Sequence, residues 1–208
     1  MKVLIVSSSF GYDGLFTSMG HELVTDVASS DLVVFTGGAD VTPHLYRAKA
    51  HKETGNDPRR DAAEQMIFDD ALERGIPMVG ICRGGQFLNV MSGGEMYQHV
   101  EKHCGPHEIT DLHTGETVLV SSTHHQMMKP SKKGLLVASS TLGGSREWYD
   151  HEIFHKDVSK EDIEVVYYPH TKSLCFQPHP EFAGEHYNPM KEYFKGLMER
   201  FVYEQVEA

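Results

Sequence analysis

The sequence predicts a three-layer α/β fold, in which a doubly wound, mostly parallel sheet is covered by helices on both faces and carries some antiparallel strands. Short β-branched apolar runs alternate with segments of helical period, the pattern of a parallel sheet with crossover helices. Several later runs are separated only by short turns, which indicates antiparallel pairing. At 208 residues the chain is expected to form a single domain over 1–208.

Each expected element rests on its own pattern of apolar residues and breakers. Strands are expected at 3–6, 31–35, 77–81, 118–120, 135–138, 163–168 and 173–176. Helices are expected at 17–28, 62–72 and 86–91, with a last helix that Asn188 caps and Pro189 begins. The polar stretch 99–115 is expected to be a loop excursion.

Composition excludes several classes of function. The chain carries 30 acidic and 19 basic residues, a formal charge of −11. Such a chain has no general attraction to nucleic-acid phosphates or anionic lipid, so nucleic-acid and membrane-surface binding are disfavoured. No apolar run has the length of a bilayer span. The first residues enter an apolar run at once without the features of a signal peptide, which predicts a cytoplasmic protein.

Cysteine usage favours chemistry over cross-linking. The three cysteines, Cys82, Cys104 and Cys175, are an odd number without paired short spacing, which is typical of neither a disulfide framework nor a zinc ribbon. Cys82 lies between the apolar run 77–81 and the helical run 86–91, at a turn rich in glycine. The helix dipole and the unpaired N–H groups at such a turn favour a thiolate.

A base and an orienting carboxylate occur 97 residues downstream of this cysteine. His179 follows the expected strand 173–176, and Glu181 stands two positions later. A histidine can accept the thiol proton, and a glutamate can hold its other ring nitrogen in the right tautomer. The three residues fit a Cys-His-Glu triad. Backbone N–H groups at Arg83 and at the Gly37-Gly38 turn are candidate donors to an oxyanion, because each follows a strand end.

Five segments, in order, resemble the class I glutamine amidotransferase-like enzymes and, within them, the γ-glutamyl-γ-aminobutyrate hydrolase group of cysteine peptidases. The segment 80–86 is similar to the family's nucleophile turn, and 178–181 to its His-Pro-Glu element. Signatures of the subgroup are similar to 37–46, 60–64 and 122–126. The resemblance covers most of the chain and implies a flavodoxin-like arrangement of the sheet.

The resemblance also implies roles for individual residues. Cys82 would attack a γ-glutamyl amide, His179 would shuttle the proton and Glu181 would orient His179. Backbone N–H groups at Gly37 or Gly38 and at Arg83 would hold the oxyanion. The side chains implied for the glutamyl pocket are Gln86, His124, His125 and Gln126. A γ-glutamyl thioester would form and be hydrolysed by water, without a cofactor or catalytic metal.

Two other interpretations stay open. The first keeps the chemistry but makes the chain a glutaminase subunit that passes ammonia to a partner synthetase or amidoligase, for which 208 residues is about the right size. A homodimer is also left open. The second is a metal-binding or non-catalytic module, because His99, His103 and His107 recur every four residues near Cys104 and His113. Gly105 and Pro106 would interrupt a helix there, so solvated loop histidines are favoured.

Overall fold

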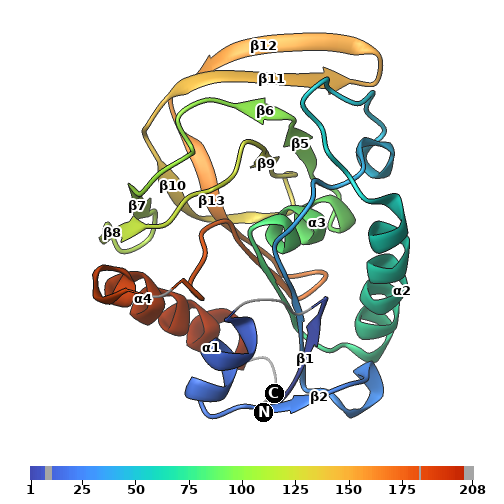
Figure 1. The fold of residues 1–208 in the computed structure, drawn as a ribbon, viewed down its shortest axis with the longest axis vertical. Coiled ribbons are helices and arrows are strands. Elements are labelled where there is room, and N and C mark those ends of the chain that lie inside the picture. Colours follow the sequence, from blue (N-terminus) through green and yellow to red (C-terminus); the bar gives the residue numbers. More distant parts are fainter. Residues whose placement is uncertain (8–10, 183, 204–208) are drawn as a thin grey trace.

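The computed structural model describes residues 1–7, 11–182 and 184–203. The main sheet in this part of the chain has nine strands in the order β2-β1-β3-β4-β14-β13-β10-β7-β8. Their bounds are β1 Lys2–Val6, β2 Glu22–Val24, β3 Leu32–Phe35, β4 Met78–Ile81, β7 His107–Asp111, β8 Thr117–Val120, β10 Leu135–Ser140, β13 Asp162–Tyr168 and β14 Ser173–Phe176. Figure 1 shows this sheet running through the middle of the molecule.

The sheet divides into a parallel and an antiparallel half. Strands β2, β1, β3, β4 and β14 pair in parallel. From β14 onward every pairing to β13, β10, β7 and β8 is antiparallel. The predicted α/β class is confirmed, although the antiparallel share is larger than the sequence indicated.

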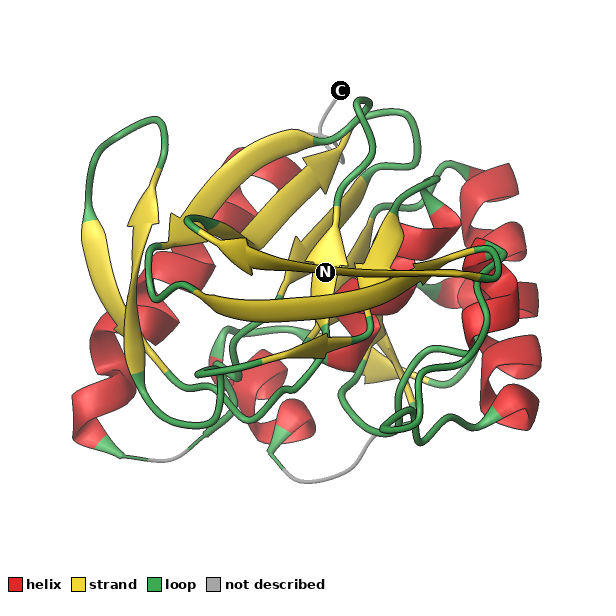
Figure 2. Ribbon diagram, turned by 90° about the horizontal axis from the view of Figure 1, so that it is seen from above, coloured by secondary structure: helices red, strands yellow, loops and turns green. Residues whose placement is uncertain are grey.

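Helices lie on both sides of the strands, as Figure 2 shows. Helices α1 (Tyr12–Ser18) and α4 (Asn188–Met198) pack on one face, and α2 (Pro58–Arg74) and α3 (Arg83–Met91) on the other. The alternation of side chains along β3 explains the two cores. Leu32 and Val34 contact the core under α1 and α4, whereas Val33 and Phe35 contact the core under α2 and α3.

Two smaller sheets lie apart from the main one in the described residues. A three-stranded sheet joins β6 (His99–Val100), β11 (Gly144–Asp150) and β12 (Ile153–Ser159), and β5 (Glu95–Tyr97) pairs with β9 (Met127–Lys129). Figure 1 shows β11 and β12 at the end of the molecule opposite the N-terminus. Short helical turns occupy η1 Val27–Ser29, η2 Pro43–Tyr46, η3 Glu185–Tyr187 and η4 Glu199–Tyr203.

Three local predictions are wrong. A helix was expected over 17–28, but α1 ends at Ser18 and residues 22–24 form β2, because pairing with β1 overrides a weak helical pattern. The stretch 99–115 is not a plain loop, since it contributes β6, which pairs with β11, and β7, which pairs with β8 and β10 in the main sheet. Asn188 is the first residue of α4 rather than its cap, which is Tyr187.

None of the helices in the described residues combines the length and the apolarity that crossing a bilayer requires.

Candidate active site

Cys82 occupies a strained turn between β4 and α3. Its backbone has φ 53° and ψ −116°, a conformation that residues with a side chain rarely adopt. Two glycines make the turn sterically feasible: a β-carbon on Gly80 would lie 2.3 Å from the carbonyl carbon of Gly84, and one on Gly84 would lie 2.0 Å from Phe35 O. The turn therefore has the geometry of a nucleophile elbow, which lifts the side chain above the sheet.

His179 follows β14, the strand next to β4, and its imidazole is held on several sides. The Cys82 side chain lies beside it, because a β-carbon on Gly37 would be 3.3 Å from His179 Cε1 and 3.6 Å from Cys82 Cβ. The ring Nδ1 lies 2.6 Å from Glu181 Oε1. The Phe182 ring stacks on it at a centroid distance of 4.5 Å. Ser121 Oγ accepts a hydrogen bond from the backbone N–H of His179 at 2.9 Å. The three predicted triad residues are thus brought together, with the ring fixed in orientation.

The electrostatics of this group favour a charged imidazole. Burial lowers the pKa of His179, but its bonds to Cys82 and Glu181 outweigh burial and raise the pKa to about 10. Because a carboxylate only accepts, Nδ1 donates its proton to Glu181. The other nitrogen, Nε2, lies 3.0 Å from Thr123 Oγ1. Thr123 is therefore a neighbour of the reactive nitrogen that the sequence did not single out for this role.

Among the described residues, the turn after β3 offers one N–H donor without an acceptor rather than two. Gly37 N–H donates to the Tyr12 hydroxyl at 3.0 Å, so it is already engaged. For Gly38 N–H no acceptor occurs among the described residues. The guanidinium of Arg60 donates to Gly37 O at 2.9 Å and thereby holds the turn in place. A β-carbon on Gly37 would lie 3.3 Å from His179 Cε1, which places this turn directly beside the imidazole.

The side chain of Arg83 is buried beneath the cysteine turn and pairs with acidic side chains. It is 2% exposed and forms ion pairs with Asp61 and Glu64 of α2. Glu64 also pairs with Arg60 at 2.7 Å, and Asp61 accepts a hydrogen bond from the Thr42 N–H at 2.9 Å. This buried network explains the segment 60–64 physically: it ties the cysteine turn to the turn after β3. The Arg83 N–H, at the start of α3, has no intrahelical acceptor.

The side chains predicted for a glutamyl pocket take different positions. Gln86 is buried and donates to Gln126 O and Gln177 Oε1, each at 3.1 Å. The Gln126 side chain is buried, and its Nε2 and Oε1 have no hydrogen-bond partner among the described residues. His125 is partly exposed, and its Nε2 lies 3.2 Å from Asp40 Oδ1. The hydrogen bond to Asp40 raises the pKa of His125.

The ring of His124 is directed into the interior. It is 4% exposed, its Nδ1 lies 2.9 Å from Gln126 O, and its Nε2 faces Glu164. Burial lowers the pKa of His124 to about 4, so the ring is neutral at pH 7. A role for His124 in a glutamyl pocket stays a prediction.

The histidines spaced by four do not form a helical metal site. His99 lies in β6, where its ring is 5.6 Å from His51, while His113 is exposed and Cys104 is exposed. The rings of His103 and His107 are buried and close together, with centroids 5.2 Å apart. Burial lowers the pKa of His103, but Asp162 and Glu164 outweigh it and raise the pKa to about 9.

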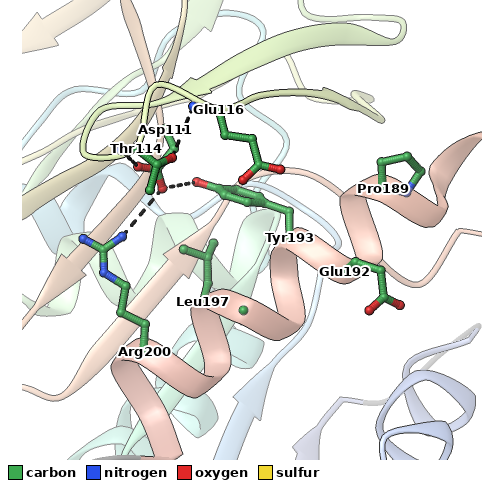
Figure 3. A pocket seen from close by; sticks show the side chains of 9 residues that line it. Asp111, Thr114, Glu116, Pro189, Glu192, Tyr193, Leu197 and Arg200 are labelled. Carbon is green, nitrogen blue, oxygen red and sulfur yellow. Dashed lines mark hydrogen bonds and ion pairs between the residues drawn. The ribbon is translucent and has the colours of Figure 1, made fainter.

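A separate pocket lies between α4 and the β7–β8 turn (Figure 3). Tyr193 donates to Asp111 Oδ2 at 2.9 Å, and Arg200 lies 3.7 Å from the same oxygen. The predicted site residues are not among the side chains that line this pocket. Its contacts hold α4 against the antiparallel half of the sheet.

Four residues of the site were missed from the sequence. Folding brings these residues to the predicted ones from distant parts of the chain: Tyr12 and Arg60 contact Gly37, and Ser121 and Thr123 contact His179. Arg60 belongs to a segment that the sequence singled out, and Thr123 adjoins His124, so motif proximity was the available signal. Tyr12 and Ser121 stand in stretches without a motif, and no pattern marks them.

Comparisons with known proteins identify the family of the chain. The family model of peptidase C26 matches residues 16–113. A putative glutamine amidotransferase-like protein, YvdE homolog, of Lactococcus lactis subsp. cremoris is 37% identical over 50% of this chain and 67% of its own length. The gamma-glutamyl-gamma-aminobutyrate hydrolase PuuD of Escherichia coli is 27% identical over 77% of this chain and 67% of its own. The chain spans 62% of a second Lactococcus relative and 43% of a Mycobacterium tuberculosis relative.

Solved structures support the fold. A glutamine amidotransferase from Thermotoga maritima superposes with a TM-score of 0.61 at 16% identity, covering 100% of this chain and 90% of that one. PurLQS from Thermotoga maritima gives 0.63 at 16% identity, covering 96% and 98%. The sequence relatives, the family model and the shared fold lead to one conclusion: this chain belongs to the class I glutamine amidotransferase-like family.

Proposed function

We propose that the protein is a cysteine hydrolase of γ-glutamyl amide bonds, with Cys82, His179 and Glu181 as its catalytic triad. One observation carries the proposal: a cysteine on a strained strand-to-helix turn lies beside an imidazole whose Nδ1 is held by a carboxylate at 2.6 Å. This is the arrangement of an activated nucleophile, its base and the group that orients the base.

The proposed reaction has two steps. His179 takes the proton of the Cys82 thiol and Sγ attacks the γ-carbonyl carbon. The carbon–nitrogen bond then breaks as His179 gives that proton to the departing amine or ammonia. Water then attacks the γ-glutamyl thioester, His179 takes its proton, and the carbon–sulfur bond breaks to release glutamate. Gly38 and Arg83 N–H groups are the proposed donors to the oxyanion, because the N–H of Gly37 is engaged by Tyr12.

The family and the buried polar groups support a γ-glutamyl substrate. PuuD is named as a gamma-glutamyl-gamma-aminobutyrate hydrolase, and other relatives are named as putative glutamine amidotransferases. Gln126 has a buried amide without a hydrogen-bond partner among the described residues, and such a group favours a contact with a polar ligand. We infer that Gln86 holds the Gln126 backbone rather than the substrate.

A second candidate is a glutaminase subunit that supplies ammonia to a synthetase. Three exposed apolar side chains on β12 favour it, since exposed apolar groups are typical of contact surfaces: Ile153, Phe154 and Val158. A free hydrolase would act on γ-glutamyl amides without a partner, whereas a subunit would be nearly inactive until its partner binds.

The test is an assay of the isolated protein against glutamine, γ-glutamyl anilide and a panel of γ-glutamyl amines, with released ammonia or amine as the readout. Cys82→Ala should abolish turnover and His179→Ala should lose about 10³-fold or more. Cys104→Ala, which removes an exposed thiol, is the matched control and should keep wild-type turnover. Wild-type turnover in Cys82→Ala would overturn the mechanism, and activity without a partner separates the two candidates.

A further inference from the structure

Three buried side chains from separate segments converge behind the candidate active site. His103 precedes β7, His124 lies between β8 and β9, and Glu164 lies in β13. One nitrogen or oxygen atom from each lies within 4.8 Å of the other two. Their side chains are 0%, 3% and 0% exposed, so water does not screen these polar groups.

The hydrogen bonds of the two histidines direct their remaining nitrogens at the carboxylate. His103 Nε2 lies 3.1 Å from Asp162 Oδ2, and His124 Nδ1 lies 2.9 Å from Gln126 O. Carboxylate and carbonyl oxygens only accept, so each of these nitrogens carries the proton. The other nitrogens are His103 Nδ1, 3.3 Å from Glu164 Oε1, and His124 Nε2, 3.7 Å from Glu164 Oε2.

The atoms that meet in this cluster lack hydrogen-bond partners. His103 Nδ1, His124 Nε2 and Glu164 Oε2 are all buried and unpaired among the described residues. A buried polar atom without a partner is destabilising, and here the lone pair of His124 Nε2 faces the carboxylate oxygen Glu164 Oε2 at 3.7 Å. A proton on His103 would satisfy that one atom but would leave His124 Nε2 and Glu164 Oε2 unpaired. A cation between the three groups would satisfy all of them.

We propose that His103, His124 and Glu164 bind a divalent first-row transition metal ion, for which zinc is the best match. Two imidazoles and a carboxylate are a ligand set that zinc accepts, and metal–ligand bonds of about 2.0–2.1 Å in tetrahedral geometry place neighbouring ligand atoms roughly 3.4 Å apart. The observed separations of 3.3 and 3.7 Å match that spacing.

The groups around the cluster have the arrangement expected of outer partners. Asp162 accepts from His103 and the Gln126 carbonyl accepts from His124, which fixes the orientation of each ring. His107 Nε2 lies 3.0 Å from Glu164 Oε1 and holds the carboxylate from the other side. The ion is assigned a positioning role rather than a place in the reaction.

The segment that would be held contacts the imidazole of the candidate triad. Ser122 Oγ donates to His103 O, and on either side of it Ser121 and Thr123 contact His179. An ion that joins His103 to His124 would therefore fix the segment 121–124 against His179. Metal binding can be measured without any activity assay, so its outcome is independent of the proposed hydrolase function.

The experiment begins with purified protein that has been treated with a chelator and then titrated with zinc chloride by calorimetry, with elemental analysis of the refilled protein. We expect one zinc ion per chain and a higher melting temperature with zinc than without it. His124→Ala and Glu164→Gln should each weaken zinc binding by at least 100-fold, and Asp162→Asn by about 10–100-fold. His113→Ala removes an exposed histidine and is the control, which should bind zinc as the wild type does.

The wild-type protein alone also decides the proposal if the variants do not fold. Cobalt(II) added to the chelator-treated wild type should give the visible ligand-field absorption of a low-coordinate site, and zinc should remove it. The proposal is overturned if the wild type binds no zinc stoichiometrically or gives no such cobalt spectrum. It is equally overturned if folded His124→Ala keeps wild-type affinity, or if His113→Ala loses as much affinity as His124→Ala.

Discussion

Replacing Cys82 by glycine should make the protein more stable than replacing it by alanine, although both changes remove the thiol. The backbone at this position has φ 53° and ψ −116°, which glycine adopts readily and alanine does not. Both variants lose the same thiol beside His179, so the comparison isolates the backbone strain.

The magnitude follows from two opposing contributions. Strain of this kind costs about 1–3 kcal/mol in a residue with a β-carbon. Glycine gains conformational freedom in the unfolded chain, which costs about 0.5–1 kcal/mol relative to alanine. With the middle of each range, the net difference favours glycine by about 1 kcal/mol. For a chain of this size that corresponds to a melting temperature about 2–4 °C higher.

Urea unfolding and calorimetry of the two variants test this prediction. The urea dependence of the unfolding free energy should be equal in both, so that the midpoints report stability alone. Ala62→Gly in α2 is the control: Ala62 is exposed on a regular helix, and glycine should cost about 1 kcal/mol there. A Cys82→Gly protein that melts at or below Cys82→Ala would refute the idea that this turn is strained.

Three further changes probe the surroundings of the turn. The pKa of His179 is about 10, because its interactions with Cys82 and Glu181 outweigh burial. Its protonated ring therefore stabilises the fold fully below pH 6.5, and this stabilisation is lost as pH rises through about 10. Glu181→Gln should therefore reduce the fall in unfolding free energy between pH 6.5 and 10, and an unchanged fall would contradict the assigned cause. Arg83→Met should destabilise by about 3–5 kcal/mol in urea unfolding, since buried Asp61 loses its cation and buried Glu64 keeps only Arg60. A loss below about 1 kcal/mol would show that the network is dispensable. Tyr12→Phe removes the hydroxyl that accepts the hydrogen bond of the Gly37 N–H. It should lower kcat about tenfold, equivalent to about 1.4 kcal/mol, with KM little changed. An unchanged kcat would separate Tyr12 from the reaction.

The buried cluster of His103, His124 and Glu164 illustrates how sequence spacing and spatial proximity differ. A spacing of four residues in 99–107 suggested ligands on one helix, but this region forms strands and separates His99 from the others. The side chains that meet His103 come from positions 124 and 164. Such groupings depend on strand pairings across dozens of residues, which local patterns do not contain.

The sequence by itself determined the α/β class, most strands of the main sheet and the identity of the three residues proposed as the triad. These features leave local traces: apolar runs, glycines at a strand-to-helix turn, and a histidine and glutamate after a strand. Tertiary structure alone decided that Gly37 N–H is engaged by Tyr12, that His124 faces Glu164, and that Arg83 is paired with carboxylates under the turn. The physical reason is that hydrogen bonds and ion pairs depend on orientation and burial, and these are set only when distant segments pack together.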